Sequence, residues 1–579
     1  MNYLPILKLW SFVVVPFLLG TLFFFNEEDE NPYPNPISGE YNFDQMMGIT
    51  LCGEMAYVPE DFLTKPIGLS NVRIGTIDFP INTKSSRAQE MFNQGMAYYY
   101  NFDYVQAARS FHDGARIDPD AAMIWNGLNI VYSNLSDSVK SQEYGEKAYQ
   151  LAKKAGNRFE YLYVKTNFLT LTPPSGLEGY QTLYDSVYAV KDALISEFAD
   201  NAESWLLASE IRLYLRGLEE SEKEGDEACL EMLEKALVAD PDHFGVWHLL
   251  IHANESLSQF EDALKYGQMY SEEASDIPHS WHMYGHDLMK TGNIDEAIIK
   301  FNRALELEKA KYKREDMPYH YDWHYPHNLE LLAYCYQYKG QFEDARKIFV
   351  QLDTIQAYTV EKEGKIRKGH PFFLLQNGEY DKAIILANKL AEGEGINTKL
   401  VAYISSGLAY MMKKDKKNAL KSSKQIELLL DSLILEMTAY GMPEEAVTGT
   451  SYFQFYQGLH DLIENGLALQ KNPNKATLKG KIEDFQNQML SQTGPDPWIE
   501  SLYFLQLLSN ITYSTGNMDL AESSAKALLE HDPKFGGGHF AMARVQKIQN
   551  NQAAAKESLS KAMDAYKDGD ESMKKSLTF

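Results

Sequence analysis

The sequence predicts an all-α solenoid of stacked helix pairs behind an N-terminal membrane anchor, and three observations support this. At 579 residues, the chain exceeds what one compact core usually holds. From Ser85 almost to the C-terminus, apolar residues recur at helical spacing between short turns. The alanines that mark second helices recur at a repeat-like distance, with 34 residues between Ala263 and Ala297. We therefore expect a repeat array rather than several separate domains.

The N-terminal segment is predicted to lie in a membrane. Residues 9–25 carry no charge, follow Lys8 and precede an acidic cluster at 27–30. This run is at the short end for a spanning helix, which needs about 17–25 residues. The charge order favours a cytoplasmic N-terminus and an exported body, periplasmic or extracytoplasmic. The alternative is a cleaved signal segment and a secreted protein.

The same signals divide the chain into five predicted parts. They are an anchor or signal segment at 1–26, an extended tether and leader at 27–84, N-terminal repeats at 85–225, His-rich central repeats at 226–350 and C-terminal repeats at 351–579.

Charge and cysteine content exclude two classes of protein. Lys and Arg number 55 against 81 Asp and Glu, which gives a net charge of −26. This balance repels phosphate backbones, so we expect no nucleic-acid partner. Cys52, Cys229 and Cys335 are far apart and form no CxxC pair, so we expect small buried residues rather than a disulfide framework or a zinc finger.

The first clear repeat is FNQGMAYYYNFDYVQAARSFHDGARIDPD. Gly95 and Ala107 allow two helices to approach closely, Phe111 fills the space between pairs, and Pro119 ends the second helix. This spacing resembles the tetratricopeptide repeat (TPR). The resemblance implies a right-handed solenoid whose first helices form a concave groove, and that groove is expected to bind a protein, a peptide or a small ligand.

Histidines recur in register on three successive first helices. Nine of the fourteen histidines lie between His243 and His327. Counted back from Ala263, Ala297 and Ala345, equal offsets select three sets: His248, His282 and Glu330; His252, His286 and Tyr334; and Gly245, His279 and His327. Within each helix the spacing is three, four or seven residues, which places each set on one face. The sequence therefore predicts imidazoles and carboxylates directed toward one common surface.

These side chains are suited to a transition metal. Histidines at i and i+4 can bind one ion from a single helix, and imidazole with carboxylate favours zinc, copper or iron over magnesium or calcium. The predicted metal ligands are His248, His252, Glu255, His282, His286, His327 and Glu330, with either glutamate as ligand or general base. The predicted groove or supporting residues are His243, His279, His324 and Tyr334. The alternative is an imidazole-lined groove that holds an anion or a peptide without an ion.

A closer resemblance supports the same site. DHFGVWHLLIHANE, IPHSWHMYGHDLMKTG and YPHNLELLAYCYQYKG are similar to a bacterial subgroup of TPR proteins with HPGxxHxxIHxxE, HxxHMxxH and HNLHF segments. Glu330 stands where that subgroup usually has His, and residues 102–104 (FDY) replace a common Phe-Asn-His. The resemblance implies a site but no particular reaction.

Two functions remain open from the sequence. The first is a membrane-tethered TPR protein whose groove binds a partner or ligand and whose His/Glu cluster is competent to bind a metal. The alternative is a metal-dependent hydrolase or oxidase built on the same scaffold. The insertion MPYHYDWHYPHN before the third helix is either a lid or an aromatic cap on that helix.

Overall fold

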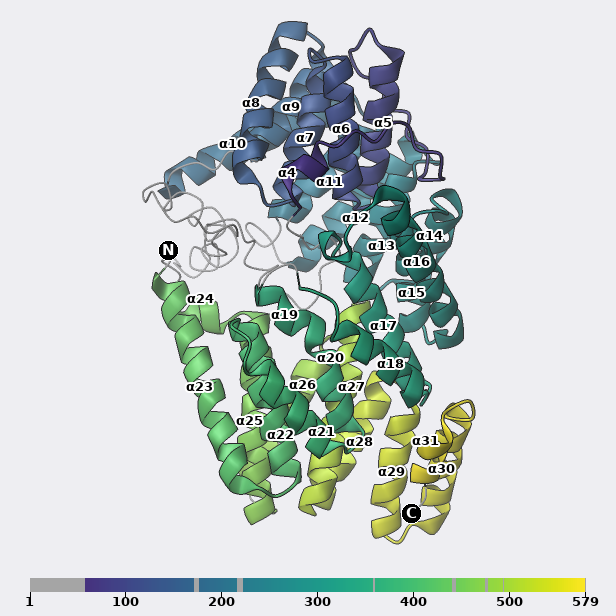
Figure 1. The fold of residues 1–579 in the computed structure, drawn as a ribbon, viewed down its shortest axis with the longest axis vertical. Coiled ribbons are helices and arrows are strands. Elements are labelled where there is room, and N and C mark those ends of the chain that lie inside the picture. The colour runs from purple at the N-terminus through teal and green to yellow at the C-terminus, as the bar shows by residue number, and fades with distance from the viewer. Residues whose placement is uncertain are drawn as a thin grey trace. The chain divides into compact units, whose positions relative to one another are not determined.

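The computed structural model describes residues 58–170, 176–215, 222–357, 360–439, 444–473, 477–492 and 494–577. These residues form helices and no strand, which confirms the all-α class (Figure 1). The predicted anchor at 1–26 and Cys52 lie outside this part of the chain. Within the described ranges, no helix is both long and apolar enough to cross a membrane.

The N-terminal helices follow one another along the chain with short connections. They are α4 (Glu60–Leu63), α5 (Ser86–Tyr100), α6 (Tyr104–Ile117), α7 (Ala122–Asn134), α8 (Ser138–Ala155), α9 (Arg158–Thr170), α10 (Gly176–Glu197), α11 (Ala202–Leu215), α12 (Glu222–Ala239), α13 (Phe244–Ser256), α14 (Phe260–Glu273), α15 (Pro278–Lys290), α16 (Ile294–Glu315) and the 3₁₀ helix η2 (Tyr319–Tyr321).

The C-terminal helices continue this arrangement. They are α17 (His324–Tyr338), α18 (Phe342–Leu352), α19 (Val360–Arg367), α20 (Gly369–Gln376), α21 (Tyr380–Leu390), α22 (Ile396–Met412), α23 (Lys416–Ala439), α24 (Glu444–Thr448), α25 (Ser451–Lys471), α26 (Thr477–Leu490), α27 (Pro495–Thr515), α28 (Met518–His531), α29 (Gly536–Ile548), α30 (Gln552–Ala565) and α31 (Glu571–Ser576).

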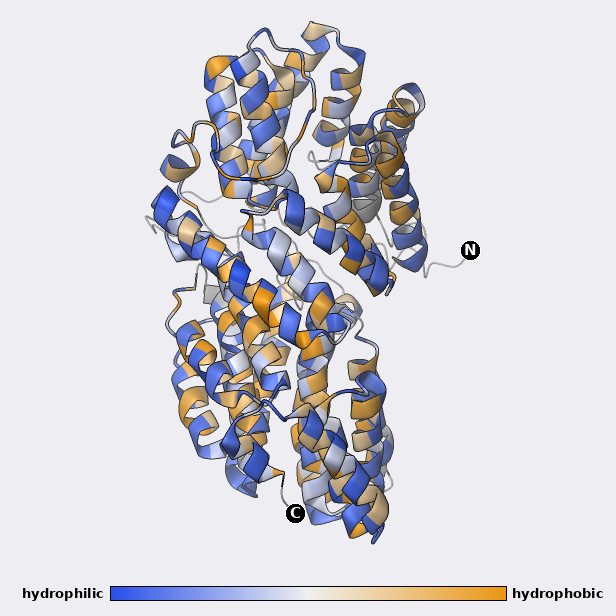
Figure 2. Ribbon diagram, turned by 90° about the vertical axis from the view of Figure 1, so that its right-hand side faces the viewer, coloured by the Kyte–Doolittle hydropathy of each residue, from blue (hydrophilic) through white to orange (hydrophobic). Residues whose placement is uncertain are grey.

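Small residues and one large aromatic side chain explain the packing of the first repeats. Phe111 of α6 is fully buried. A Cβ atom added at Gly95 of α5 would lie 2.4 Å from its ring, and one added at Gly127 of α7 would lie 2.6 Å away. The two glycines therefore let three helices close around one ring. Figure 2 shows hydrophobic and hydrophilic residues on the same helices, as expected for amphipathic helices that bury one face.

The turns within helix pairs share a left-handed residue. Gly292, Gly340, Gly378 and Gly516 occupy this position with φ between 72° and 81°. Four other turns have Ser136, Ser258, Lys414 or Asn550 there, with φ between 59° and 62°, and the turn between α5 and α6 has the bulky Phe102, with φ of 53°. Glycine adopts this conformation without steric cost, whereas a bulky side chain is strained there. Phe102 is therefore placed at this turn against its conformational preference.

The described chain divides into two compact units. The first contains the described residues of 58–287 together with 303–324, and the second contains 288–302 together with those of 325–577. The division falls within α15, within α16 and at the start of α17. It therefore runs through the predicted central region at 226–350, whose boundaries stay a prediction.

In the first unit, the leader connects the first repeats to the histidine-bearing helices. Phe79 packs against Phe92 and Tyr163, with ring centroids 5.4 and 5.6 Å away. The leader also contacts the segment before α15, where the backbone N–H of Asp276 donates to the carbonyl of Arg73 at 3.0 Å. Helix α5 also contacts α13 directly. The end of α5 and the following turn are thereby held against the histidines of α13.

Candidate metal centre

Three imidazoles of the first unit converge through their Nε2 atoms. His248 Nε2 on α13 lies 3.1 Å from His252 Nε2 and 3.0 Å from His279 Nε2 on α15. The candidate ligand atoms of these three residues all lie within 4.8 Å of one another. A tetrahedral ion with bonds of 2.0–2.1 Å separates its ligand nitrogens by about 3.3 Å. Two of the three nitrogen separations are thus close to those of a three-histidine metal site, and the third is at most 4.8 Å.

The protonation of these rings directs lone pairs toward the shared point. The Nδ1 atom of His248 donates to the carbonyl oxygen of Tyr100 at 2.6 Å, because that oxygen can only accept. Burial lowers the pKa of His248 well below its usual range, so the ring is neutral and its unprotonated Nε2 can accept a hydrogen bond from His252 or His279 or bind an ion. His252 Nδ1 lies 3.1 Å from Glu255 Oε2, so this ring, like that of His248, is held through Nδ1 and directs Nε2 toward the shared point. A hydrogen bond to the outer nitrogen is the usual support for a metal-binding imidazole.

Glu255 orients histidines on two helices. One of its oxygens lies 3.1 Å from His252 Nδ1, and the other lies 3.1 Å from His286 Nδ1. Burial acts to raise the pKa of Glu255, but hydrogen bonds from the two histidines outweigh it and lower that pKa to about 2. Glu255, predicted as a ligand or general base, is therefore engaged as a carboxylate behind the imidazoles.

A glycine in α13 permits the contact between Tyr100 and His248. A Cβ atom added at Gly245 would lie 2.6 Å from Cγ of Tyr100. The Tyr100 hydroxyl donates to Glu203 Oε2 at 2.5 Å, and His243 Nε2 lies 3.2 Å from Glu203 Oε1. The Nδ1 atom of His243 accepts from the backbone N–H of Val246 and caps α13. His243, predicted as a supporting residue, thus fixes the start of this helix and its contact with α5.

Phe102 and Tyr270 shield the converging rings. The centroid of Phe102 lies 4.5 Å from that of His248, 5.8 Å from that of His252 and 5.3 Å from that of His279. On α14, Tyr270 stacks on His248 at 4.9 Å. His248 is fully buried and His279 is 4% exposed. His248 and His279 are therefore buried within the first unit, whereas the side chain of His252 is 27% exposed. The predicted groove stays a prediction.

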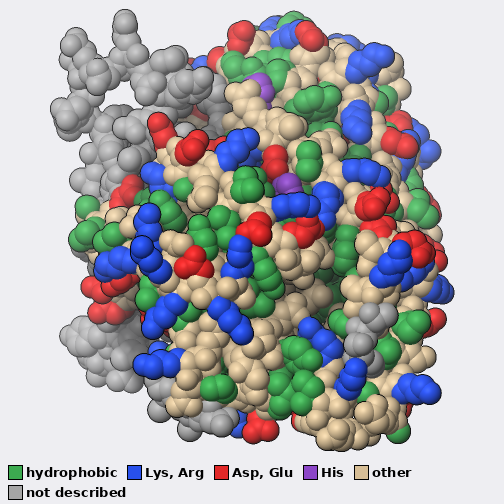
Figure 3. All heavy atoms as spheres, turned by 60° about the horizontal axis from the view of Figure 1, so that its bottom comes forward, with side chains coloured by type: hydrophobic (Ala, Val, Ile, Leu, Met, Phe, Trp, Pro, Cys, Tyr) green, Lys and Arg blue, Asp and Glu red, His purple; other side chains and the backbone are tan. Residues whose placement is uncertain are grey.

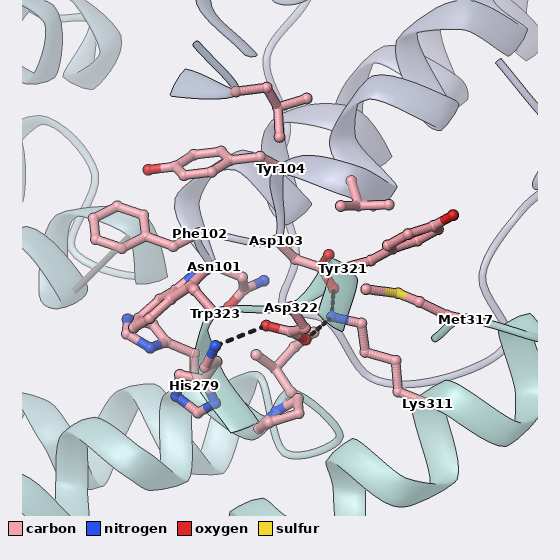
Figure 4. Close-up of a pocket in the computed structure, with 15 residues that line it drawn as sticks. Asn101, Phe102, Asp103, Tyr104, His279, Lys311, Met317, Tyr321, Asp322 and Trp323 are labelled. Atoms are coloured by element: carbon pink, nitrogen blue, oxygen red, sulfur yellow. Dashed lines mark hydrogen bonds and ion pairs between the residues drawn. The ribbon is translucent and has the colours of Figure 1, made fainter. Parts of the chain in front are cut away.

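A small cavity lies beside His279 (Figure 4). Its volume is about 40 Å³, which suffices for a few water molecules. His279, His324 and Phe102 contribute to its wall, together with a buried ion triad in which Lys311 Nζ lies 2.8 Å from Asp103 Oδ2 and 3.0 Å from Asp322 Oδ2. The insertion before α17 supplies part of this wall. Its predicted role as a lid stays a prediction.

The other predicted residues of the first unit form a neighbouring group. His282 and His286 lie one turn apart on α15, with ring centroids 4.9 Å apart. The centroid of His324 lies 4.6 Å from that of His282, and His324 Nδ1 lies 2.5 Å from Glu308 Oε1.

Figure 3 shows one face of the molecule, where Lys, Arg, Asp and Glu are interspersed and little histidine is visible.

The remaining predicted ligands belong to the second unit. His327 Nε2 lies 3.4 Å from Asp496 Oδ2. The Tyr334 hydroxyl donates to Glu330 Oε1 at 3.1 Å, and Lys368 pairs with Glu500 nearby. Burial raises the pKa of Glu330 to about 7, although the charge of Lys368 opposes this. Glu330 and Tyr334 therefore belong to a buried carboxylate–lysine–tyrosine group of the second unit, and their predicted part in the metal site stays a prediction.

Sequence reasoning missed Tyr100, Phe102 and Glu308. The carbonyl of Tyr100 is a backbone group 148 residues from His248, and no side-chain pattern identifies such a contact. Phe102 had a signal in the FDY segment, which departs from the subgroup's Phe-Asn-His. Glu308 lies 16 residues before His324, on the preceding α-helix. Helical spacing relates residues of one helix only, so it does not predict this contact between two helices.

Fold and site together define an all-helical protein of successive helix pairs with three converging imidazoles, two of which are buried. No protein-family model matches its sequence. No curated protein matches it significantly.

Several solved structures show weak similarity to this chain. PilW, a widely conserved type IV pilus biogenesis factor, is 16% identical over 46% of this chain and 93% of its own, with a TM-score of 0.24. The human IFIT1 dimer with m7Gppp-AAAA is 14% identical over 84% and 91%, with a TM-score of 0.33. The APC/C hetero-tetramer Cut9-Hcn1 is 14% identical over 85% and 96%, with a TM-score of 0.28. These scores carry no conclusion about ligands, and the charge-based expectation of no nucleic-acid partner stays a prediction.

Proposed function

We propose that this protein binds a transition metal ion through His248, His252 and His279. The observation that carries the proposal is the convergence of three Nε2 atoms, two of them on rings whose Nδ1 atoms are held by Tyr100 and Glu255. Neutral imidazoles favour zinc, copper or iron. The predicted scaffold belongs to the same proposal: a right-handed TPR solenoid, tethered to a membrane by its N-terminal segment, with its body exported.

The ligand expected at this centre is small. His248 and His279 are buried and both contact Phe102, so an extended peptide can reach only the partly exposed His252. Three protein ligands leave the fourth position of a tetrahedral ion for water or substrate. The cavity that His279 helps to form is the route by which such a molecule reaches the ion.

The same cavity favours a second candidate function, a metal-dependent hydrolase or oxidase. A bound ion activates water or polarises a substrate only where an open coordination position meets a solvent-filled space. The first unit provides that space beside a proposed ligand. The residues of the wall do not select one reaction over the other.

Elemental analysis of the full-length chain, purified without a histidine tag, tests metal binding. We expect at least one zinc, copper or iron ion per chain and the loss of one ion in His248→Ala. His539→Ala is the matched control, because His539 lies in the second unit and contacts the carbonyl of Pro533. Circular dichroism checks that each variant is folded. Absence of metal in the parent, even after reconstitution with each ion, overturns the proposal.

A further inference from the structure

A second group of three imidazoles lies beside the first in the same unit. His282 is its central ring, with centroid distances of 4.9 Å to His286 and 4.6 Å to His324. In the first group, the corresponding distances from His248 are 4.9 Å to His252 and 4.8 Å to His279. Each group thus combines two histidines one turn apart on a helix with a third from another segment.

His324 supplies an observation that points to a ligand. Its side chain is 6% exposed, and its Nδ1 is held by Glu308. Its Nε2 is buried and has no hydrogen-bond partner among the described residues. Buried polar atoms are nearly always satisfied, and an exception calls for a bound water or ion. The fixed Nδ1 leaves Nε2 as the atom that such a ligand would meet.

Buried carboxylates support both groups from behind. Glu255 contacts His252 of the first group and His286 of the second, and Glu308 contacts His324. Negative charge buried behind imidazoles is stabilised when the rings bind a cation. Glu255 therefore couples the two groups through one carboxylate.

The two groups are also adjacent. The ring of His279 in the first group lies 5.2 Å from that of His324 and 5.7 Å from that of His282 in the second. One ring from each group, His279 and His324, reaches the cavity wall. A small molecule in that cavity meets a ligand of each group.

We infer that His282, His286 and His324 hold a second transition metal ion, so that the centre is binuclear and its small ligand binds in the adjacent cavity. This inference rests on the proposed function for the first ion. Two neighbouring ions clamp a water or substrate oxygen between them, which a single ion does not do.

The test is the metal content of the full-length chain after reconstitution with zinc and gel filtration. We expect two ions per chain in the parent, one in His324→Ala and one in His248→Ala. His320→Ala is the matched control, because His320 lies in the same insertion but in neither group, and it should retain two ions. Cobalt titration of the same variants, followed by visible absorption, should show two binding steps reduced to one.

The outcomes separate the two claims. One ion in the parent that is lost in His248→Ala and kept in His324→Ala overturns the second site and leaves the first intact. No ion in the parent overturns both. If His324→Ala does not fold, Glu308→Gln replaces it, and we expect its second ion to bind about 10–100-fold more weakly while the first is unchanged. Unchanged affinity for both ions in a folded Glu308→Gln would also overturn the second site.

Discussion

Glu255→Gln tests the proposed orienting role most directly. Each oxygen of Glu255 accepts one Nδ1–H bond, from His252 and from His286, at 3.1 Å in both cases. Glutamine has nearly the same shape but only one acceptor oxygen, and its amide group donates instead. At least one imidazole must then lose its bond or carry its proton on Nε2. A protonated Nε2 cannot bind a metal.

The expected loss follows from the function of such supporting groups. Removing a hydrogen-bond partner behind a metal-binding histidine typically weakens metal affinity by about 10–100-fold. At about 1.36 kcal/mol per tenfold, this corresponds to about 1.4–2.7 kcal/mol. The larger value is expected when both histidines take part in metal binding, because Glu255 supports both.

Competition with a chromophoric zinc chelator measures this affinity. Parent, Glu255→Gln and Glu261→Gln are titrated under identical conditions. Glu261 is exposed on α14 and serves as the matched control, for which we expect parental affinity. A folded Glu255→Gln with an affinity within about twofold of the parent, against the 10–100-fold typical of such groups, would refute the orienting role.

Three further predictions concern packing and charge. Gly245→Ala places a Cβ atom 2.6 Å from Tyr100, so it should lower the free energy of unfolding by about 1–3 kcal/mol and weaken metal binding. The control Gly480→Ala, whose Cβ atom has nothing within 4 Å, should be neutral or stabilising in thermal denaturation. Lys311→Met leaves Asp103 and Asp322 buried without their cation and should cost about 3–5 kcal/mol in urea denaturation, against little change for the exposed Lys309→Met. Burial raises the pKa of Glu330 from 4.5 to about 7, so its contribution to stability is present below pH 4.5 and lost as the pH rises through 7. Glu330→Gln should therefore gain stability relative to the parent between pH 5 and pH 8, and a constant difference would contradict this assignment.

The spacing of residues predicted helices and faces, but not the contacts between distant segments. The i and i+4 spacing placed His248 and His252 on one face of α13 and His282 and His286 on one face of α15. Equal offsets suggested that Glu330 would continue the same arrangement. In the structure, Glu330 lies in the second unit beside Tyr334 and Lys368, and its predicted role at the metal site stays a prediction. Helical periodicity fixes the direction of a side chain around its own axis, whereas its partner depends on how successive pairs pack.

The burial of His248 and His279 has a similar explanation. A groove formed by first helices is open only if nothing from the same chain occupies it. Here the leader reaches Asp276 and the end of α5 packs on α13, so the turn at Asn101–Asp103 lies over the imidazoles. These contacts join residues separated by 148 to 203 positions. Such long-range packing leaves no periodic signal in the sequence.

Phe102 connects the fold to the proposed function. A non-glycine residue in the left-handed region costs about 1–2 kcal/mol; four other turns have glycine there and four have Ser136, Ser258, Lys414 or Asn550, but Phe102 is the bulkiest of these side chains. Strain of this kind persists where surrounding contacts offset it, and it is concentrated at functional sites. Here the Phe102 ring contacts Tyr104 and the three imidazoles whose Nε2 atoms converge, with centroids within 5.8 Å of each. The first helix pair carries no proposed metal ligand, but it contributes the apolar side chain that covers the centre. The stability of this turn should therefore depend on whether the histidines beneath it bind a metal ion.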